Sequence, residues 1–415
     1  MGCVLIAPDK FKGSLSAPEV AAHLARGLTA AVPGLVTDEV PVADGGDGTV
    51  DAAVAAGYRR IDLRVSGPTG EAVMAAFALR GDVAVVEAAQ ACGLSRLPGG
   101  RLQPLTATSY GVGELIAAAA DAGAGRIVLG LGGSATTDGG AGLIAGLGGR
   151  LLGADGAPVA PGGAALAGLR ELDVTGLRDL SRVAVVLASD VDNPLLGPDG
   201  AAAIYGPQKG ASPEDISVLE EGLARWADVV ETALGERFRA QPGTGARSPG
   251  PGEWAAAGVV DGVASSRVRE RAGAGAAGGL GFAALAFLGA TMRPGIEVVL
   301  ELVSFADRAA GASLVITGEG SLDAQTLRGK APAGVARATR AVSPQTPVVA
   351  VAGACSLDRG SLGQAGISAA YALANLEPDV ASSMANAGPL LEKLAAQVAA
   401  DWLPSRGTPF RPVTG

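Results

Sequence analysis

The chain has 415 residues, of which 48% are hydrophobic, and its formal net charge is −9. This length suits two or three domains, and the apolar content excludes general disorder. The acidic balance and an aromatic content of 3% argue against a nucleic-acid partner, which requires basic surfaces and stacking side chains. No apolar run reaches the roughly 18 residues of a membrane span, and no signal peptide is recognisable. We therefore expect a cytoplasmic protein that has no membrane partner.

Scarce residue types narrow the candidate chemistry. His23 is the only histidine, and its apolar helical surroundings predict a core-edge or solvated side chain rather than a catalytic one. The three cysteines are scattered singly, which predicts neither a zinc site nor disulfides. Lysine occurs at only five positions, four of them in glycine-rich or loop-like segments, and Asn193 lies in such a segment too.

The chain opens with a short apolar strand, a loop and a helix. The loop carries Lys10, Lys12 and Ser14. Ser16, with Glu19 three residues later, predicts a capping box at the start of the helix. Helix N-termini attract anions, so the two lysines beside this one favour an anion site over an ordinary turn.

A second strand is predicted at residues 39–42, before a glycine loop that contains Asp44 and Asp47 and a helix from about Val50. Paired aspartates in a glycine loop indicate either metal or hydroxyl binding or a capped turn. The spacing is not that of a calcium loop, which needs more oxygen ligands at defined steps.

The pattern changes from about residue 61. Short strands at 61–65, 73–79 and 83–87, separated by turn residues, predict antiparallel sheet. A helix is predicted at 114–122 and a buried strand at 126–130.

The loop after that buried strand favours phosphate binding over a plain turn. Gly132 and Gly133 would let backbone N–H groups approach a phosphate, while Ser134 and Thr136 offer hydroxyls. Asp138, further along the loop, is a candidate for a metal or hydroxyl contact.

Two further polar segments follow a predicted strand at 183–187. Asp190, Asp192 and Asn193 come directly after this strand, and Lys209 follows in a glycine-containing turn. Carboxylates at a strand end are candidates for a base or for metal ligands.

Two glycine-rich segments have no predicted catalytic role. Residues 241–252 are rich in glycine and proline and predict a surface loop. Residues 273–278 match GxGxxG, but an arginine-rich helix is predicted before them instead of a strand. The dinucleotide fingerprint therefore fails on context, and close helix packing is the better interpretation.

Residues 313–336 carry the densest set of candidates. A buried strand at 314–316 is expected to end at Thr317, where two glycines free the backbone. The candidates that follow are Gly318, Glu319, Gly320, Asp323 and Lys330. Carboxylates and a lysine at the carboxyl edge of a parallel sheet suit a metal-bound phosphate ester, although a polar turn is the alternative.

The parallel α/β pattern returns after about residue 296. We therefore predict an α/β protein with two unlike domains: a discontinuous parallel-sheet domain at 1–60 and 300–400, and an inserted mixed α/β domain at 61–299. Residues 401–415 would form a tail. The site is expected in the cleft between the domains.

Six segments, taken in order, resemble the type-1 family of glycerate kinases, and the resemblance covers nearly the whole chain. They are APDKFKGSLSA, VADGGDGTVDA, LGGSATTDGGAG, ASDVDNPLLGPDGAAAIYGPQKGA, GAGAAGGLGFAALAFLGATMRPGIE and TGEGSLDAQTLRGKAPAGVA. The resemblance implies a bacterial ATP-dependent kinase forming 2-phosphoglycerate, with one flavodoxin-like (Rossmann-like) domain and one unlike α/β domain. The sequence departs from the family pattern at Lys10 (serine expected), Asp47 (glutamate), Thr137 (asparagine) and Ser321 (arginine).

A glycerate kinase would use ATP and Mg²⁺, and the chain contains no Walker A motif. Asp190 is the candidate base or Mg²⁺ ligand, and the other candidate ligands are Asp192, Glu319 and Asp323. Lys12 and Lys330 would bind the glycerate carboxylate or the transferring phosphate. The candidate nucleotide contacts are Gly132, Gly133, Ser134, Thr136, Gly318 and Gly320, and the candidate substrate contacts are Ser14, Asp44, Asp47, Asn193 and Lys209.

Two other functions fit parts of the pattern. A nicotinamide-dependent oxidoreductase of a small hydroxy acid would also use glycine-rich strand ends, but it lacks its fingerprint here. A non-catalytic protein that binds a small anion fits the composition but leaves the carboxylates unexplained. Either a monomer or a homodimer is expected.

Overall fold

The computed structural model describes residues 2–240, 267–328 and 330–403. Contacts divide the chain into two units, of which the first comprises residues 1–44, 51–57 and 294–415, and the second residues 45–50 and 58–293. The predicted junctions near residues 60 and 300 lie close to these borders. The short excursion of residues 45–50 into the second unit was not predicted.

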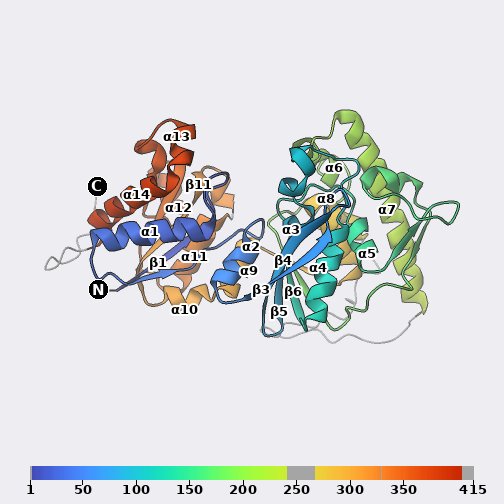
Figure 1. Ribbon diagram of the computed structural model, residues 1–415, viewed down its shortest axis with the longest axis horizontal. Helices are drawn as coiled ribbons and strands as arrows, with labels where there is room; N and C mark the ends of the chain where they lie inside the picture. The colour runs from blue at the N-terminus through green and yellow to red at the C-terminus, as the bar shows by residue number, and fades with distance from the viewer. Residues whose placement is uncertain (1, 241–266, 329, 404–415) are drawn as a thin grey trace. The chain divides into compact units, whose positions relative to one another are not determined.

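The first unit is built on a five-stranded sheet whose strands are all parallel (Figure 1). The strand order is β13-β12-β11-β1-β2, with bounds Ala369–Ala372, Val348–Cys355, Ala312–Leu322, Cys3–Pro8 and Thr37–Glu39. Successive residues of β1 point to opposite faces of the sheet, and both faces are apolar. These strands therefore read as continuous hydrophobic runs, which is typical of parallel sheets covered by helices on both sides.

Helices cover the two faces of this sheet. α1 (Ala17–Ala31) and α14 (Ala387–Trp402) pack on one face, as Figure 1 shows. The opposite face is covered by α9 (Gly295–Leu302), α10 (Phe305–Ala309), α11 (Ala331–Val342) and α12 (Arg359–Gln364). α13 (Val380–Ala385) and α2 (Thr49–Ala55), whose first two residues belong to the second unit, complete the helices described for this unit. Consequently, α1, which follows β1, and α11, which follows β11, lie on opposite faces of the sheet.

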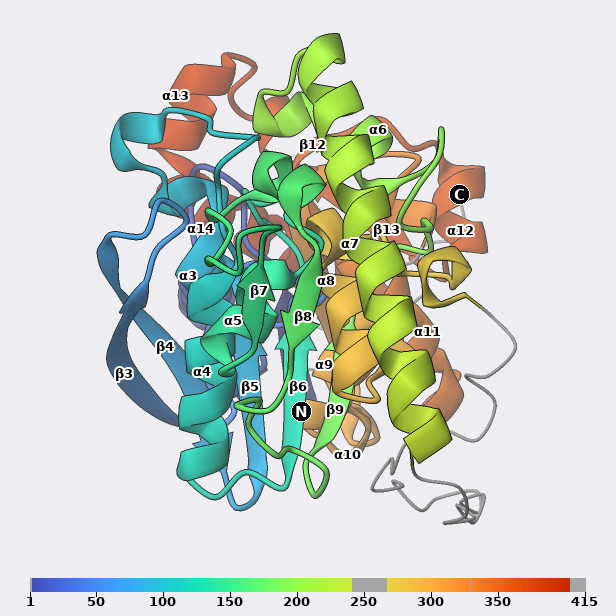
Figure 2. The same ribbon diagram turned by 90° about the vertical axis from the view of Figure 1, so that its right-hand side faces the viewer.

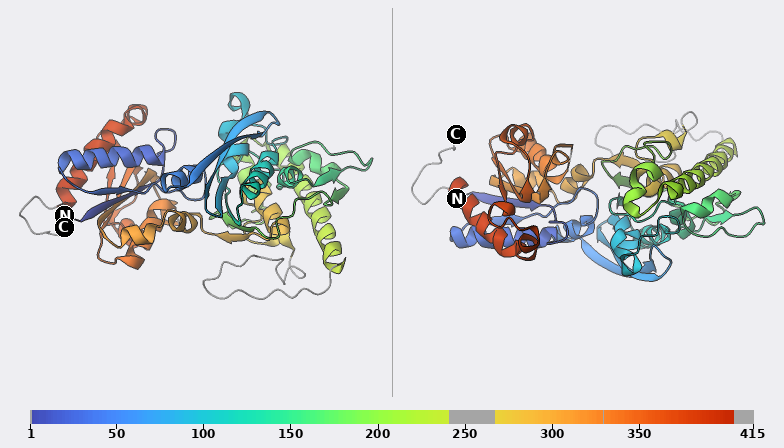
Figure 3. Two further views of the ribbon diagram at one scale, coloured as in Figure 1. Left: turned by 60° about the horizontal axis from the view of Figure 1, so that its bottom comes forward. Right: turned by 90° about the horizontal axis from the view of Figure 1, so that it is seen from above.

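The second unit contains a mixed six-stranded sheet. Its order is β10-β9-β6-β5-β4-β3, with bounds Thr291–Arg293, Ala184–Ala188, Arg126–Gly130, Val83–Glu87, Ala72–Arg80 and Arg59–Ser66. The first four strands are parallel, and the last two add antiparallel pairs, as predicted for residues 61–87. Figure 3 shows β3 and β4 as the long hairpin at the edge of this sheet.

The helices of the second unit pack around one hydrophobic core. They are α3 (Ala88–Cys92), α4 (Tyr110–Asp121), α5 (Ala141–Gly146), α6 (Ala201–Tyr205), α7 (Pro213–Ala240) and α8 (Ala276–Phe287), and a small sheet of β7 (Arg150–Leu152) and β8 (Glu171–Asp173) lies beside them. Figure 2 shows the long α7 running along the outside of the unit. Among the described residues, no helix is both long and apolar enough to cross a membrane.

Three predicted boundaries were wrong. β2 ends at Glu39 and does not span 39–42, although the N–H groups of Val40 and Val42 still donate to β1 over 2.8 and 2.9 Å. Pro41 between them occupies the alternate position, whose amide faces away from β1, so its missing N–H removes no bond to β1. The predicted tail begins too early because α14 continues to Trp402. The rest of the tail and the predicted loop at 241–252 lie outside the described residues.

The third wrong boundary concerns β11, which continues through Glu319 to Leu322 and does not end at Thr317. Gly318 and Gly320 are not among the residues with a left-handed backbone. A Cβ on Gly318 would lie 2.3 Å from the carbonyl oxygen of Val351 in the neighbouring strand. Glycine at position 318 thus allows the close packing of β11 against β12. Glu319 lies within β11, so its backbone is held by pairing with β12.

Candidate active site

The carboxyl edge of the first sheet brings β1 and β11 together where the strand order reverses, because β2 is added on one side of this pair and β12 and β13 on the other. Pro8 pairs with Gly318, and the N–H of Asp9 donates to the Gly318 carbonyl over 2.8 Å. The helices that follow these two strands, α1 and α11, pack on opposite faces of the sheet. In open α/β sheets ligands bind at such a reversal point.

Asp9 is the first residue after β1 and is only 7% exposed. Its Oδ1 accepts a hydrogen bond from the Lys10 N–H (2.6 Å) and lies 3.9 Å from the Lys10 ammonium. Burial raises the pKa of the Asp9 carboxyl to about 7; Lys10 lowers it, and Asp44 and Glu319 raise it further. Asp9 was not among the predicted site residues, although in the sequence it lies between the end of a predicted strand and two lysines.

Glu319 faces the same edge from β11 and is 8% exposed. Its Oε1 accepts a hydrogen bond from the Thr326 hydroxyl (2.6 Å), and its Oε2 lies 3.8 Å from the Lys330 ammonium. Burial raises the pKa of Glu319, Thr326 and Lys330 lower it, and Asp323 and Asp44 raise it. The structure therefore brings Glu319 and Lys330 together, two residues that the sequence singled out.

Asp323 supports this arrangement from the turn after β11. Its carboxylate accepts from the Gln325 N–H over 2.7 Å, and its own N–H donates to the Thr326 hydroxyl over 3.0 Å. The turn thereby orients the hydroxyl that binds Glu319. The predicted metal contact of Asp323 stays a prediction.

The loop between β1 and α1 lies directly over β11. A Cβ on Gly320 would lie 3.3 Å from the Lys12 backbone nitrogen, so glycine allows this close approach. The Lys12 side chain is exposed, whereas the Ser14 hydroxyl donates to the Met384 carbonyl over 3.1 Å. The predicted capping box is confirmed, because the Ser16 N–H donates to the Glu19 carboxylate over 2.8 Å.

His23 lies elsewhere, at the packed interface of α1 and α14. Its Nδ1 is 2.8 Å from a carboxylate oxygen of Glu392, and its side chain is 22% exposed. The prediction of a core-edge histidine is confirmed.

In the second unit, the glycine-rich loop after β6 is anchored from inside. Lys209 is 2% exposed, and its ammonium donates to the Ser134 hydroxyl (3.2 Å) and the Thr136 carbonyl (2.6 Å). Burial lowers the pKa of Lys209 to about 8. Gly132 and Gly133 form the part of this loop that is open to solvent. The predicted contact of Lys209 with substrate stays a prediction, and its observed contacts shape the loop.

Asp138, a candidate for a metal or hydroxyl contact, is engaged inside the protein. It is 1% exposed, and its two oxygens accept hydrogen bonds from the N–H groups of Ser109, Gly140 and Gly142 and from the Ser109 hydroxyl. The Trp226 indole donates to the Gly139 carbonyl over 2.9 Å in the same loop. Asp138 and Trp226 therefore fix the conformation of the loop.

Residues 45–50 pack onto this loop backbone to backbone. A Cβ on Gly132 would lie 2.5 Å from the Gly46 Cα. Glu87, at the end of β5, accepts hydrogen bonds from the N–H groups of Gly48 and Val50 over 3.2 Å each. Asp47 is exposed in this segment, while Asp44 belongs to the first unit. No local pattern indicated that Glu87 holds this segment, because its partners lie almost 40 positions earlier in the chain.

Asp190 and Asp192 are both exposed after β9, at the same edge of the second sheet as the glycine-rich loop. The neighbouring Asn193 uses both ends of its amide: its Nδ2 donates to the Asp199 carbonyl (2.7 Å), and its Oδ1 accepts from the Tyr205 hydroxyl (2.8 Å). Asn193 therefore orders the loop that presents the two carboxylates.

Residues 4–403 match the model of the glycerate kinase family. The chain belongs to this family.

Named relatives agree with this membership. The glycerate kinase of Bacillus subtilis (strain 168) is 43% identical over 401 residues, covering 96% of this chain and 97% of the relative. The glycerate 2-kinase of Escherichia coli (strain K12) is 40% identical over 375 residues, covering 89% and 90%. A crystal structure from Salmonella typhimurium LT2, provisionally named glycerate kinase 2, has a TM-score of 0.75 and 38% identity, covering 96% of this chain and 98% of that one.

The GxGxxG segment of this family member does not follow a strand. A short 3₁₀ turn (Val268–Glu270) precedes it where an arginine-rich helix was predicted. A Cβ on Gly278 would lie 1.9 Å from the Thr136 carbonyl oxygen. The prediction of close packing is confirmed, since these glycines hold α8 against the loop after β6.

Within the described part of this family member, no three or more histidine, cysteine, aspartate or glutamate side chains are grouped to hold a metal. Mg²⁺ in kinases is bound by one or two carboxylates together with substrate phosphates, so a complete protein cage is not required. The acidic oxygens of Glu319 and Asp190 are donors of the hard type that Mg²⁺ prefers.

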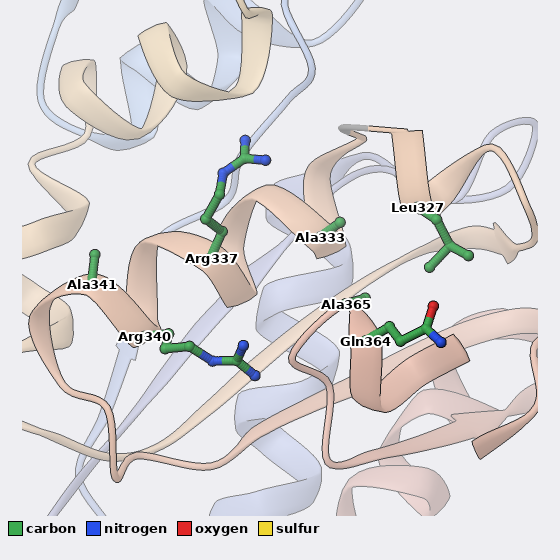
Figure 4. Close-up of a pocket in the computed structure, with 7 residues that line it drawn as sticks. All are labelled: Leu327, Ala333, Arg337, Arg340, Ala341, Gln364 and Ala365. Carbon is green, nitrogen blue, oxygen red and sulfur yellow. The ribbon is translucent and has the colours of Figure 1, made fainter. Parts of the chain in front are cut away.

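A separate groove of about 430 Å³ lies between α11 and α12 (Figure 4). Its lining includes Arg337, Arg340 and Gln364, and Leu327 lies at one end. One guanidinium nitrogen of Arg337 lies 3.3 Å from the Glu297 carboxylate.

Proposed function

We propose that this protein transfers the γ-phosphoryl group of ATP to the 2-hydroxyl of D-glycerate in a Mg²⁺-dependent reaction that yields 2-phosphoglycerate. The single observation that supports this most is the full-length family match, because relatives named glycerate kinase and glycerate 2-kinase align over nearly the entire chain. A cytoplasmic location would supply ATP and Mg²⁺.

The acceptor is assigned to the carboxyl edge of the first sheet. Lys12 and Lys330 are the candidate partners of the glycerate carboxylate or of the transferring phosphate. The Lys330 ammonium lies beside Glu319, and the backbone of Lys12 lies over β11. Ser14, Asp44, Asp47, Asn193 and Lys209 remain candidate substrate contacts. A kinase needs this kind of positioning and electrostatic stabilisation more than covalent chemistry.

The nucleotide phosphates are assigned to the glycine-rich loop of the second unit. The solvent-facing Gly132 and Gly133 would offer backbone N–H groups, and Ser134 and Thr136 would complete the loop. Gly318 and Gly320 are further candidates for nucleotide contact.

The candidate Mg²⁺ ligands are Asp190 and Asp192 in the second unit and Glu319 and Asp323 in the first. When bound, this ion would neutralise charge on the phosphates. Asp190 was predicted as a base or a ligand, and its exposed carboxylate suits a ligand.

The decisive experiment measures ADP release from Mg·ATP with and without D-glycerate, with the product identified by phosphorus NMR. Glycerate-dependent ADP release with a 2-phosphoester would support the proposal. A 3-phosphoester would retain the kinase but overturn the position of transfer. A folded protein that shows no stimulation by glycerate would overturn the proposed acceptor. The comparisons give no support to the nicotinamide-dependent alternative.

A further inference from the structure

We propose that Asp9 is the catalytic residue that accepts the proton of the attacking hydroxyl group. This inference rests on the proposed kinase function and deepens it. Neither the sequence motifs nor the names of the relatives assign a role to this residue.

Asp9 lies at the carboxyl end of β1, at the point of the sheet where open α/β folds bind their ligands. It directly follows β1, and its main chain is fixed by the hydrogen bond from its N–H to the Gly318 carbonyl. The space above β1 and β11 is the reversal point of the sheet, where ligands bind in open α/β folds. A carboxylate rigidly held at this point can meet an acceptor hydroxyl without rearrangement of the backbone.

The two buried carboxylates at this edge have different partners. Glu319 is engaged by the Thr326 hydroxyl and the Lys330 ammonium, one on each of its oxygens. Asp9 instead contacts the neighbouring Lys10 through its Oδ1, which accepts from the Lys10 N–H and lies 3.9 Å from the Lys10 ammonium. Carboxylates in environments this different take different roles, so Glu319 suits a fixed negative charge and Asp9 suits proton transfer.

The electrostatics around Asp9 support this role. Three charged side chains act on it: Lys10 favours the ionised carboxylate, whereas Asp44 and Glu319 oppose it. Burial is the largest effect, and the pKa of Asp9 is about 7. A general base works best when its pKa lies near the operating pH. A carboxyl group with this pKa suits proton exchange near neutral pH.

The acceptor hydroxyl oxygen forms a bond to the γ-phosphorus while its proton passes to the Asp9 carboxylate. The bond between the γ-phosphorus and the bridging oxygen breaks, and ADP leaves with that electron pair. Asp9 then releases the proton to water.

The test compares Asp9→Asn, which keeps the shape of the side chain, with Asp190→Asn. In Asp9→Asn, kcat should fall by roughly 10²- to 10⁴-fold, the range for loss of a positioned base, while the KM values for ATP and glycerate change little. The wild type should show an acidic limb with a midpoint near pH 7 in its rate profile. Asp190→Asn should retain this limb in its residual activity, and Asp9→Asn should lose it. Asp9→Glu should recover part of kcat.

A readout without turnover is available from carbon NMR of protein labelled at the aspartate carboxyls. One resonance that is absent from Asp9→Asn should titrate near pH 7 in the free enzyme. Binding of Mg·ATP, measured by calorimetry, should be unchanged in Asp9→Asn, which also shows that the variant is folded.

Three results would overturn the assignment. The first is that Asp9→Asn keeps the acidic limb, and the second is that Asp190→Asn loses it. The third is that a folded Asp9→Asn variant binds Mg·ATP at least tenfold more weakly, because that result would identify Asp9 as a metal ligand. An active wild type with an unaffected Asp9→Asn variant would refute this inference alone. A wild type that phosphorylates no hydroxy acid would refute the proposed function and this inference together.

Discussion

At the scale of single residues, burial decides which polar side chains can change their charge near neutral pH. Asp9 and Lys209 are both almost completely buried, and burial shifts their pKa values in opposite directions because it disfavours the charged form of each. The first lies at the edge of a sheet and the second lies inside a loop. We therefore expect the Asp9 titration to affect turnover and the Lys209 titration to affect stability.

Lys209 should make the free energy of unfolding increase with pH. Its pKa is about 8 in the fold and 10.5 in the unfolded chain, so the unfolded chain binds more protons between these values. Stability from this group should thus rise between pH 8 and 10.5, by up to about 3 kcal/mol, and stay constant below pH 8. In Lys209→Met this rise should be absent. Urea unfolding of both proteins across pH 7 to 10 measures the difference, and identical slopes would contradict the prediction.

Asp190→Asn tests the other predicted catalytic position. Loss of a charged ligand or base in a kinase site should lower turnover by orders of magnitude and leave the fold intact, because the side chain is exposed and supports no core. Steady-state kinetics with Mg·ATP and glycerate, together with a thermal melt, provide the measurement. Near-normal turnover would remove Asp190 from the mechanism.

At the scale of elements, glycines set how closely loops approach strands. Gly132→Ala places a Cβ within 2.5 Å of the Gly46 Cα, so residues 45–50 must shift away from the loop after β6. We expect a loss of roughly 1–3 kcal/mol in stability, typical of overpacking, and a raised KM for ATP. Chemical denaturation and kinetics test both effects.

The matched control is Gly363→Ala in α12. A Cβ there meets no atom within 4 Å, and the backbone is not left-handed. This change should be neutral or stabilise by up to about 1 kcal/mol, because alanine restricts the unfolded chain. If both variants behaved alike, close packing at Gly132 would not be the cause.

At the scale of the whole molecule, the described residues form separate hydrophobic cores. One core belongs to the second unit, and the two faces of the parallel sheet belong to the first. Chains with more than one core often depart from two-state unfolding. We expect a calorimetric enthalpy larger than the van't Hoff enthalpy.

Substitutions in each core should then move different parts of the calorimetric transition. Trp226→Phe removes a fully buried side chain and its bond to Gly139 in the second unit. Leu24→Ala leaves a cavity under α1 in the first unit and should cost about 2–5 kcal/mol. A single transition that both variants shift as a whole would contradict separate unfolding.

The sequence alone predicted those features that depend on local pattern. Short apolar runs located the central strands at 126–130 and 184–188 within one residue, because burial on both faces requires continuous hydrophobicity. The Ser16 and Glu19 pair predicted the start of α1, since capping is a contact between neighbours in the chain. Six ordered motifs were enough to indicate the family.

Only the tertiary structure decided which of the candidate polar residues are buried and what they contact. Lys209 and Asp138 looked like ligand contacts in glycine-rich segments, but distant segments enclose them. The burial of Asp9 beside Glu319 depends on the pairing of β1 and β11, which lie more than 300 positions apart in the sequence. Charge state depends on desolvation and on neighbours brought in by folding, and neither is encoded in the local pattern of residues.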